Sequence, residues 1–144
     1  MNKKPVKKPK RVKQATKKEI EEIKALFLEH YPDSVTELQY QDLYELLISV
    51  MLSAQCTDKR VNIITPALFE AYPSPVELSN ADLNELKGYI KSCTFFNNKA
   101  KNLIKMAQSV MENYGGEIPL LQEELVKLAG VGQKTANVVM IEYT

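Results

Sequence analysis

The sequence predicts an all-α fold, and three observations favour it over any fold that contains a sheet. Beyond the first 18 residues, apolar side chains recur at the three- and four-residue spacing of helices. No segment shows the strict alternation of a half-buried strand, and no hairpin turn joins two such segments. Residues that commonly cap helices precede several of the periodic stretches. With 44% hydrophobic residues among 144, the chain can form one domain with a substantial core.

The first two predicted helices follow a basic segment. Thr16 and Glu19 form a capping box for a helix over residues 17–30, which Pro32 ends. The second helix, over residues 42–53, has an apolar face broad enough for a buried helix. We therefore expect this second helix to lie inside the domain.

Three further helical stretches follow in the sequence. Thr57 can cap the first, which Pro66 either kinks or restarts. Ser79 and Asp82 together are expected to cap the second. The third, over residues 98–113, has an apolar stripe on one face, and a pair of glycines ends it.

Composition excludes several other classes of protein. No run approaches the ~18 apolar residues of a membrane span, and the basic N-terminus lacks the apolar stretch of a secretory signal. The two cysteines, Cys56 and Cys93, lie far apart, and His30 is the single histidine. We therefore expect reduced thiols in an intracellular protein, without a disulfide framework or a metal site.

The N-terminal segment carries most of the positive charge. Residues 1–18 hold nine Lys and Arg residues and no acid, which leaves a net charge of −8 on the rest of the chain. The prolines and the absence of a core-forming pattern predict a disordered basic tail over residues 1–16. Such a tail can bind nucleic acid nonspecifically, act as a nuclear localisation signal, or simply be solvated.

The stretch LAGVGQKTANVV, residues 128–139, is the most informative part of the chain. A short amphipathic helix is expected over residues 121–128 and a second helix over residues 133–141. Gly130 and Gly132 lie between them and allow a positive φ and a close approach to a ligand. The start of the second helix attracts anions through its N–H groups and its dipole. Lys134 lies in that first turn, where a cation opposes the dipole, which indicates a specific role.

The residues of this stretch allow two other interpretations. GVGQKT shares letters with a phosphate-binding P-loop, but Gln133 separates Gly132 from Lys134 and no strand precedes it. This disfavours a nucleotide hydrolase. The second interpretation is an ordinary turn between helices with a solvated lysine.

The same stretch resembles the helix-hairpin-helix motif of the endonuclease III family, DNA glycosylases with AP-lyase activity that excise oxidised pyrimidines. Three further segments resemble that family in order and spacing: LLISVMLSAQCTDKRVN (46–62), YIKSCTFFNNKAKNLI (89–104) and GGEIP (115–119). The resemblance covers roughly residues 20–139. It implies a six-helix barrel within residues 17–144, preceded by an extra N-terminal helix and the basic tail, with the motif at residues 121–142.

The resemblance also implies the catalytic residue. Lys134 matches the family's amine nucleophile, and its presence points to the lyase-competent branch. An amine attacks carbon only when neutral, and a helix dipole is too weak to remove the proton by itself. Desolvation beneath bound DNA is therefore expected to make Lys134 reactive.

Two loops match family segments that enter the DNA once a base is flipped out. Gln55 matches a glutamine that enters the base stack, although it could instead cap a helix. Phe95 lies where the family often has a leucine wedge, although Phe96 could be the exposed residue and Phe95 the core one. The remaining candidate DNA contacts are Gly130, Val131 and Gly132 of the hairpin, and Lys59, Arg60, Lys99 and Lys101, which could equally form solvated helix faces.

The sequence ends at Thr144, before the positions of the family's essential aspartate and of its four-cysteine iron–sulfur cluster. The resemblance thus indicates a C-terminally truncated form with impaired chemistry and without the 4Fe–4S cofactor in this chain. The expected partner is double-stranded DNA with damaged bases or abasic sites, bound by a monomer without membrane contact. The expected location is the cytoplasm, on the nucleoid, if the source is bacterial, and a nuclear location stays open. The alternative function is a noncatalytic helix-hairpin-helix DNA-binding remnant.

Overall fold

The computed structural model describes residues 37–143 together with positions 18, 21, 22 and 25. Within residues 37–143 it has no strand, and its helices are α2 (Leu43–Ser53), α3 (Asp58–Ala71), α4 (Pro75–Ser79), α5 (Leu83–Ile90), α6 (Phe96–Asn113), α7 (Gln122–Leu125) and α8 (Gln133–Tyr143). The all-α prediction is confirmed. The four described positions of the predicted first helix are helical, and the rest of that helix and the basic tail lie outside the described residues.

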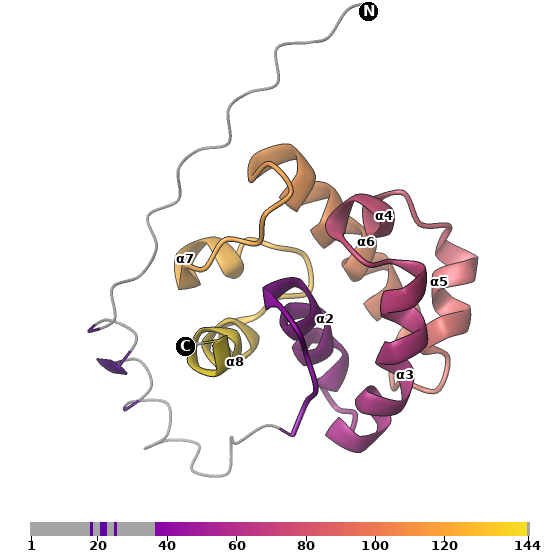
Figure 1. Ribbon diagram of the computed structural model, residues 1–144, viewed down its shortest axis with the longest axis horizontal. Coiled ribbons are helices and arrows are strands. Elements are labelled where there is room, and N and C mark those ends of the chain that lie inside the picture. The colour runs from indigo at the N-terminus through magenta and orange to yellow at the C-terminus, as the bar shows by residue number, and fades with distance from the viewer. Residues whose placement is uncertain (1–17, 19–20, 23–24, 26–36, 144) are drawn as a thin grey trace, which may run out of the picture.

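Helix α2 is the centre of the fold, as its apolar composition predicted. Eight of its eleven residues are buried, and it contacts α3, α6 and α8. In Figure 1, α7 and α8 lie on one side of α2, and α3, α4 and α5 lie on the other. Asp42 begins the helix by accepting a hydrogen bond from the Glu45 amide at 2.8 Å.

Helix α3 packs against α2, whereas α4 and α5 pack against α6. One of the predicted caps of these helices is wrong. Thr57 caps α3 as expected, accepting from the Arg60 amide at 3.1 Å, and α3 continues through Pro66 without restarting. The predicted joint cap of α5 is wrong. Asp82 alone accepts from the Glu85 amide at 2.9 Å, because Ser79 ends the short helix α4 and donates to the Val76 carbonyl.

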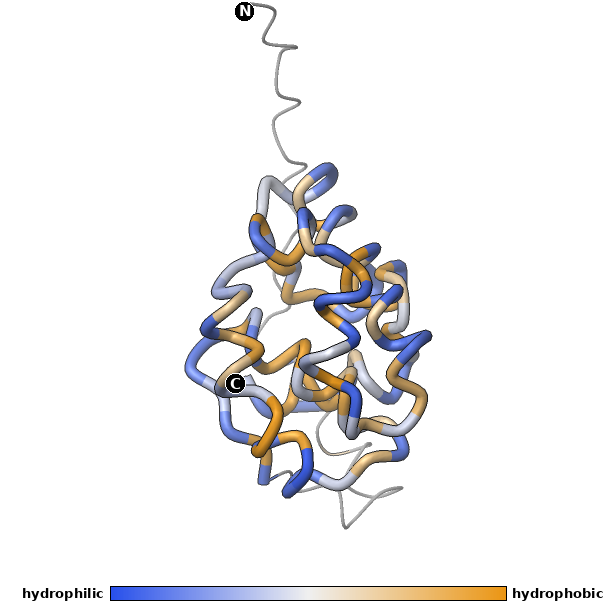
Figure 2. Tube along the Cα trace, turned by 90° about the vertical axis from the view of Figure 1, so that its right-hand side faces the viewer, coloured by the Kyte–Doolittle hydropathy of each residue, from blue (hydrophilic) through white to orange (hydrophobic). Residues whose placement is uncertain are grey.

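Helix α6 is the longest described helix and begins two residues earlier than predicted. Its apolar stripe faces α4 and α5, with Ala100, Leu103, Met106, Ala107 and Val110 fully buried. Gly116, at φ +86°, donates its amide to the Val110 carbonyl at 3.1 Å and ends the helix. Figure 2 shows the resulting pattern, in which apolar and polar segments alternate along the helices. None of the described helices combines the length and the apolar character needed to cross a membrane.

Candidate functional site

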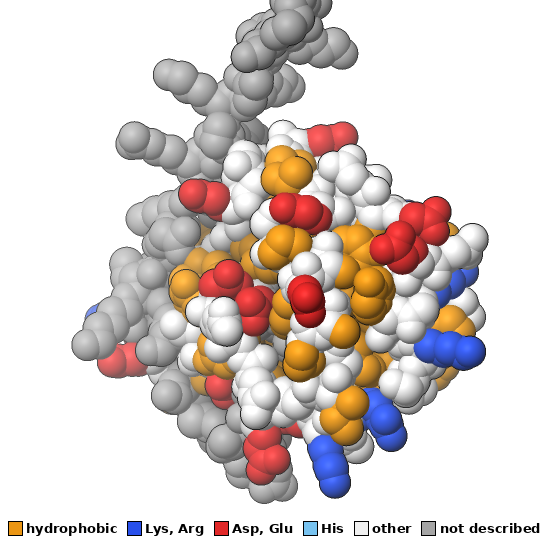
Figure 3. All heavy atoms as spheres, turned by 45° about the vertical axis from the view of Figure 1, so that its right-hand side comes forward, with side chains coloured by type: hydrophobic (Ala, Val, Ile, Leu, Met, Phe, Trp, Pro, Cys, Tyr) orange, Lys and Arg blue, Asp and Glu red, His pale blue; other side chains and the backbone are white. Residues whose placement is uncertain are grey.

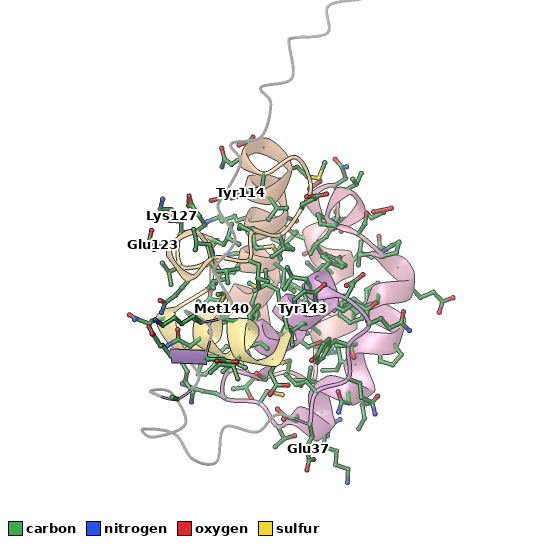
Figure 4. The ribbon with its side chains drawn as sticks, turned by 60° about the vertical axis from the view of Figure 1, so that its left-hand side comes forward. Glu37, Tyr114, Glu123, Lys127, Met140 and Tyr143 are labelled. Atoms are coloured by element: carbon green, nitrogen blue, oxygen red, sulfur yellow. The ribbon has the colours of Figure 1, made fainter. Side chains whose placement is uncertain are left out.

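The helix before the hairpin is shorter than predicted, and tight turns complete it. Helix α7 covers four residues, after which the amides of Lys127 and Leu128 bond to carbonyls three residues earlier. The Tyr114 hydroxyl donates to Glu124 Oε2 at 2.9 Å and ties α7 to the end of α6. Burial, reinforced by this bond to the carboxylate, raises the pKa of Tyr114 to about 12. Figure 4 shows Tyr114 in this region, with Glu123 and Lys127 near α7 and Met140 on α8.

Gly130 turns the chain between the two helices of the motif. Its φ is +76°, as the sequence predicted. A Cβ atom at this position would also lie 2.8 Å from Asn102 Cβ on α6. Glycine is therefore needed for the backbone conformation and for the packing of the hairpin against α6.

Gly132 meets a different constraint from the one predicted. It is not among the residues with positive φ, so the expected left-handed conformation is wrong at this position. Its carbonyl accepts from the Ala136 amide at 2.9 Å and starts α8, which requires an ordinary backbone conformation. Among the described residues, apart from its two chain neighbours, no atom lies within 4 Å of a Cβ built at this position, so these residues leave the space beside Gly132 open to a ligand.

The side chains around Gly132 divide between the core and the surface. Val131 is 5% exposed and belongs to the core, and its amide donates to the Leu128 carbonyl at 3.1 Å inside the hairpin. Lys134 is exposed in the first turn of α8. The opposite face of α8 is buried against α2 through Ala136, Val139 and Met140. Gln122 Nε2 donates to Asn137 Oδ1 at 2.6 Å and fixes α7 to α8.

Gln55 and Phe95 share an uncommon backbone conformation. Each has a φ of +58°, and they are the two non-glycine residues with positive φ in the described part of the chain. Both are exposed, and Phe95 has 59% of its surface accessible. Non-glycine residues in this region carry strain that is often found at functional sites. The sequence had singled out these two residues for their place in the loops, without any signal for their conformation.

The structure also decides between the alternatives left open for these loops. Phe96 is half-buried and packs against the core, so Phe95 is the exposed phenylalanine. Thr57 caps α3, so Gln55 does not. Gln55 instead follows the C-cap residue Ala54 of α2, where left-handed residues commonly end helices.

The basic residues near the loops fall into two groups. Lys59, Arg60 and Lys101 are exposed on α3 and α6 and can reach a ligand. Lys99 is half-buried. Its Nζ donates to the Leu52 carbonyl at 2.7 Å and to the Ala54 carbonyl at 2.6 Å, so the alternative of a solvated helix face is wrong for Lys99, and its contact with phosphate stays a prediction.

The two cysteines lie beside the same loops. Both are free thiols, Cys93 buried and Cys56 half-buried. Burial raises the pKa of the Cys93 thiol to about 11. Two thiols cannot supply the four ligands of a 4Fe–4S cluster, and the described residues contain no group of three or more candidate metal ligands. The residues of this chain therefore do not fit that cofactor.

The described residues thus form an all-α domain with a helix-hairpin-helix and with two exposed residues of positive φ, Gln55 and Phe95, next to the end of α2 and the start of α6. Residues 48–141 match the family model described as HhH-GPD superfamily base excision DNA repair protein, and the chain belongs to this superfamily.

Curated relatives and solved structures agree with this assignment. The chain is 45% identical to endonuclease III of Synechocystis sp. over 129 residues, covering 89% of this chain and 59% of that protein. It is 47% identical to endonuclease III of Bacillus subtilis over 110 residues, covering 76% and 50%. The chain thus spans between half and three fifths of the length of these relatives.

The structural matches cover most of the chain. A trapped endonuclease III–DNA covalent intermediate superposes with a TM-score of 0.72 at 42% identity, covering 88% of this chain and 60% of that one. A thermostable thymine-DNA glycosylase superposes with a TM-score of 0.67 at 25% identity, again covering 88% and 60%. These matches support the predicted fold of the domain.

Proposed function

We propose that the chain is a base excision repair enzyme of the endonuclease III type, with glycosylase and AP-lyase chemistry toward oxidised pyrimidines. The observation that carries the proposal is the position of Lys134, exposed in the first turn of α8 directly after the hairpin. The 42% identity to an endonuclease III that was trapped covalently on DNA supports it.

The proposed chemistry follows from an amine and an abasic sugar. Lys134 Nζ attacks C1′ of the opened sugar, and loss of water forms an imine. The imine acidifies the C2′ proton, whose removal expels the 3′ phosphate by β-elimination. Hydrolysis of the imine returns the amine. Because Lys134 is exposed in the free chain, bound DNA would supply the desolvation that favours the neutral amine.

The remaining candidate residues have proposed roles in holding the DNA. The open space beside Gly132 lets a phosphate approach the first turn of α8, where helix N–H groups lack intrahelical partners. Gln55 and Phe95 would enter the gap left by a flipped base. Lys59 and Arg60 would contact phosphates.

The proposal includes the partner and the location. Double-stranded DNA with a damaged base or an abasic site is the proposed substrate, bound by one copy of the chain and without a 4Fe–4S cluster held by its own cysteines. Such a substrate places the protein with chromosomal DNA, in the cytoplasm if the source is bacterial. A nuclear location stays open as the alternative.

Borohydride trapping on abasic duplex DNA tests the function. We expect the chain to trap on the abasic duplex and to lose trapping entirely in Lys134→Gln, because only an amine forms the imine. Lys127→Gln is the matched control, since Lys127 is an exposed lysine paired with Glu124 at 2.9 Å near α7. Full trapping by Lys134→Gln would refute the assignment. DNA binding without any trapping would indicate the noncatalytic alternative.

A further inference from the structure

The ammonium group of Lys99 joins the two loops that carry Gln55 and Phe95. Lys99 lies in the first turn of α6, four residues after Phe95, and its own amide donates to the Phe95 carbonyl at 3.0 Å. Its Nζ reaches the carbonyls of Leu52 and Ala54 at the end of α2, directly before Gln55. The third contact of Nζ is Cys93 Sγ at 3.5 Å, two residues before Phe95.

These contacts provide hydrogen-bond donors to the last carbonyls of α2. The last carbonyls of a helix have no intrahelical partner. The Leu52 carbonyl accepts from both Lys99 Nζ and the Cys93 thiol, the latter at 3.2 Å. The Ser53 carbonyl accepts from the Cys56 amide at 3.1 Å, and the Ala54 carbonyl accepts from Lys99. Lys99 and Cys93 thus supply side-chain donors where the left-handed turn at Gln55 leaves the helix.

The electrostatics explain why the bridging residue is a lysine. A cation in the first turn of α6 is disfavoured by the dipole of that helix. The same cation at the C-terminus of α2 is favoured by the dipole of α2. An ammonium group has three donors, and Lys99 Nζ has three acceptors within reach, two carbonyl oxygens and one sulfur.

We propose that Lys99 is a positioning residue that fixes the two loop tips, Gln55 and Phe95, at the separation needed to enter the DNA together. The hydrogen bonds of Lys99 Nζ, called the bridge below, join the end of α2 to the start of α6. The two left-handed residues lie directly beside these two helix ends. This role rests on the proposed function for its use in DNA binding, whereas the bridge itself is a property of the free protein.

Hydrogen exchange in the free chain tests the bridge without any DNA. Lys99→Met keeps the aliphatic stem and removes the three donors. We expect exchange of the Cys56 and Lys99 amides to accelerate about tenfold or more, while amides inside α2 exchange as before. Lys101→Met removes a charge from the same helix at an exposed position and should leave both loops unchanged. Unchanged exchange at both loops in Lys99→Met, or equal acceleration across the whole domain, would overturn the proposal.

DNA affinity tests the consequence of the bridge. The probe is a duplex with one tetrahydrofuran abasic analogue, compared with the same duplex undamaged. Lys99→Met should weaken binding to the abasic duplex about tenfold, equivalent to ~1.4 kcal/mol, with little change on the undamaged duplex, since the loop tips act only at the gap. Lys101→Met should weaken both duplexes equally. Equal loss on both duplexes in Lys99→Met would make Lys99 a mere source of charge and overturn the positioning role. If the unaltered chain does not distinguish the two duplexes, the proposed function fails, and hydrogen exchange still decides the bridge.

Discussion

Gly130 and Gly132 are two residues apart in the hairpin, yet the fold constrains only the first. Gly130 has a positive φ, and a Cβ at this position would lie 2.8 Å from Asn102 Cβ on α6, which leaves no room for a side chain. Gly132 has an ordinary φ and open space around it. A glycine that the fold does not require points to a partner that does, and a DNA phosphate is the partner proposed above.

The two glycines therefore predict opposite outcomes for the same substitution. Gly130→Ala should lower the free energy of unfolding by about 1–3 kcal/mol, because the new Cβ strains the backbone and meets Asn102. Gly132→Ala should leave the free energy of unfolding nearly unchanged and weaken binding to duplex DNA. Urea unfolding and a DNA titration of both variants measure the two effects. Normal DNA affinity in Gly132→Ala would argue against phosphate approach at that position.

At the scale of elements, the order of the helices and the central place of α2 followed from the sequence, because long apolar stripes have few other ways to be buried. The boundaries followed less well where short turns compete with helices. Ser79 and Asp82 both have capping side chains, and only the presence of α4 decides which of them caps α5. The hydrogen bonds of Lys99 to the end of α2 could not be predicted from the sequence for a different reason. Its acceptors are 45 and 47 residues away in the chain, and no local pattern marks them.

The caps of α5 give a test at this scale. Asp82→Ala removes the side chain that accepts from the Glu85 amide, so it should destabilise the domain by about 1 kcal/mol. Ser79→Ala removes a hydroxyl that only bonds back to Val76, and it should cost clearly less. Thermal unfolding of the two variants makes the comparison. Equal losses would mean that Ser79 contributes to the cap after all.

At the scale of the whole molecule, charge is divided between the N-terminal segment and the rest. The chain beyond residue 18 is acidic overall, and Figure 3 shows Asp and Glu side chains spread over one face, with Lys and Arg side chains toward its edge. An acidic body repels DNA at long range, so the proposed function needs a compensating positive segment. The basic residues of the N-terminal segment can supply it.

Deletion of residues 1–18 tests this division of charge. Each phosphate neutralised by a Lys or Arg adds about −0.9 to the slope of log affinity against log salt on duplex DNA. The shortened chain should bind duplex DNA more weakly and with a shallower slope, while its preference for an abasic duplex over an undamaged one stays the same, because lysines and arginines that meet only phosphates carry no lesion information. A second variant, with the seven Lys and Arg residues of residues 3–13 changed to glutamine, keeps the length of the segment. It should shift the slope in the same direction by a smaller amount, since Lys17 and Lys18 remain. An unchanged salt slope in both variants would show that the segment does not touch DNA. A lost preference for the abasic duplex would instead place part of the lesion recognition in the N-terminal segment.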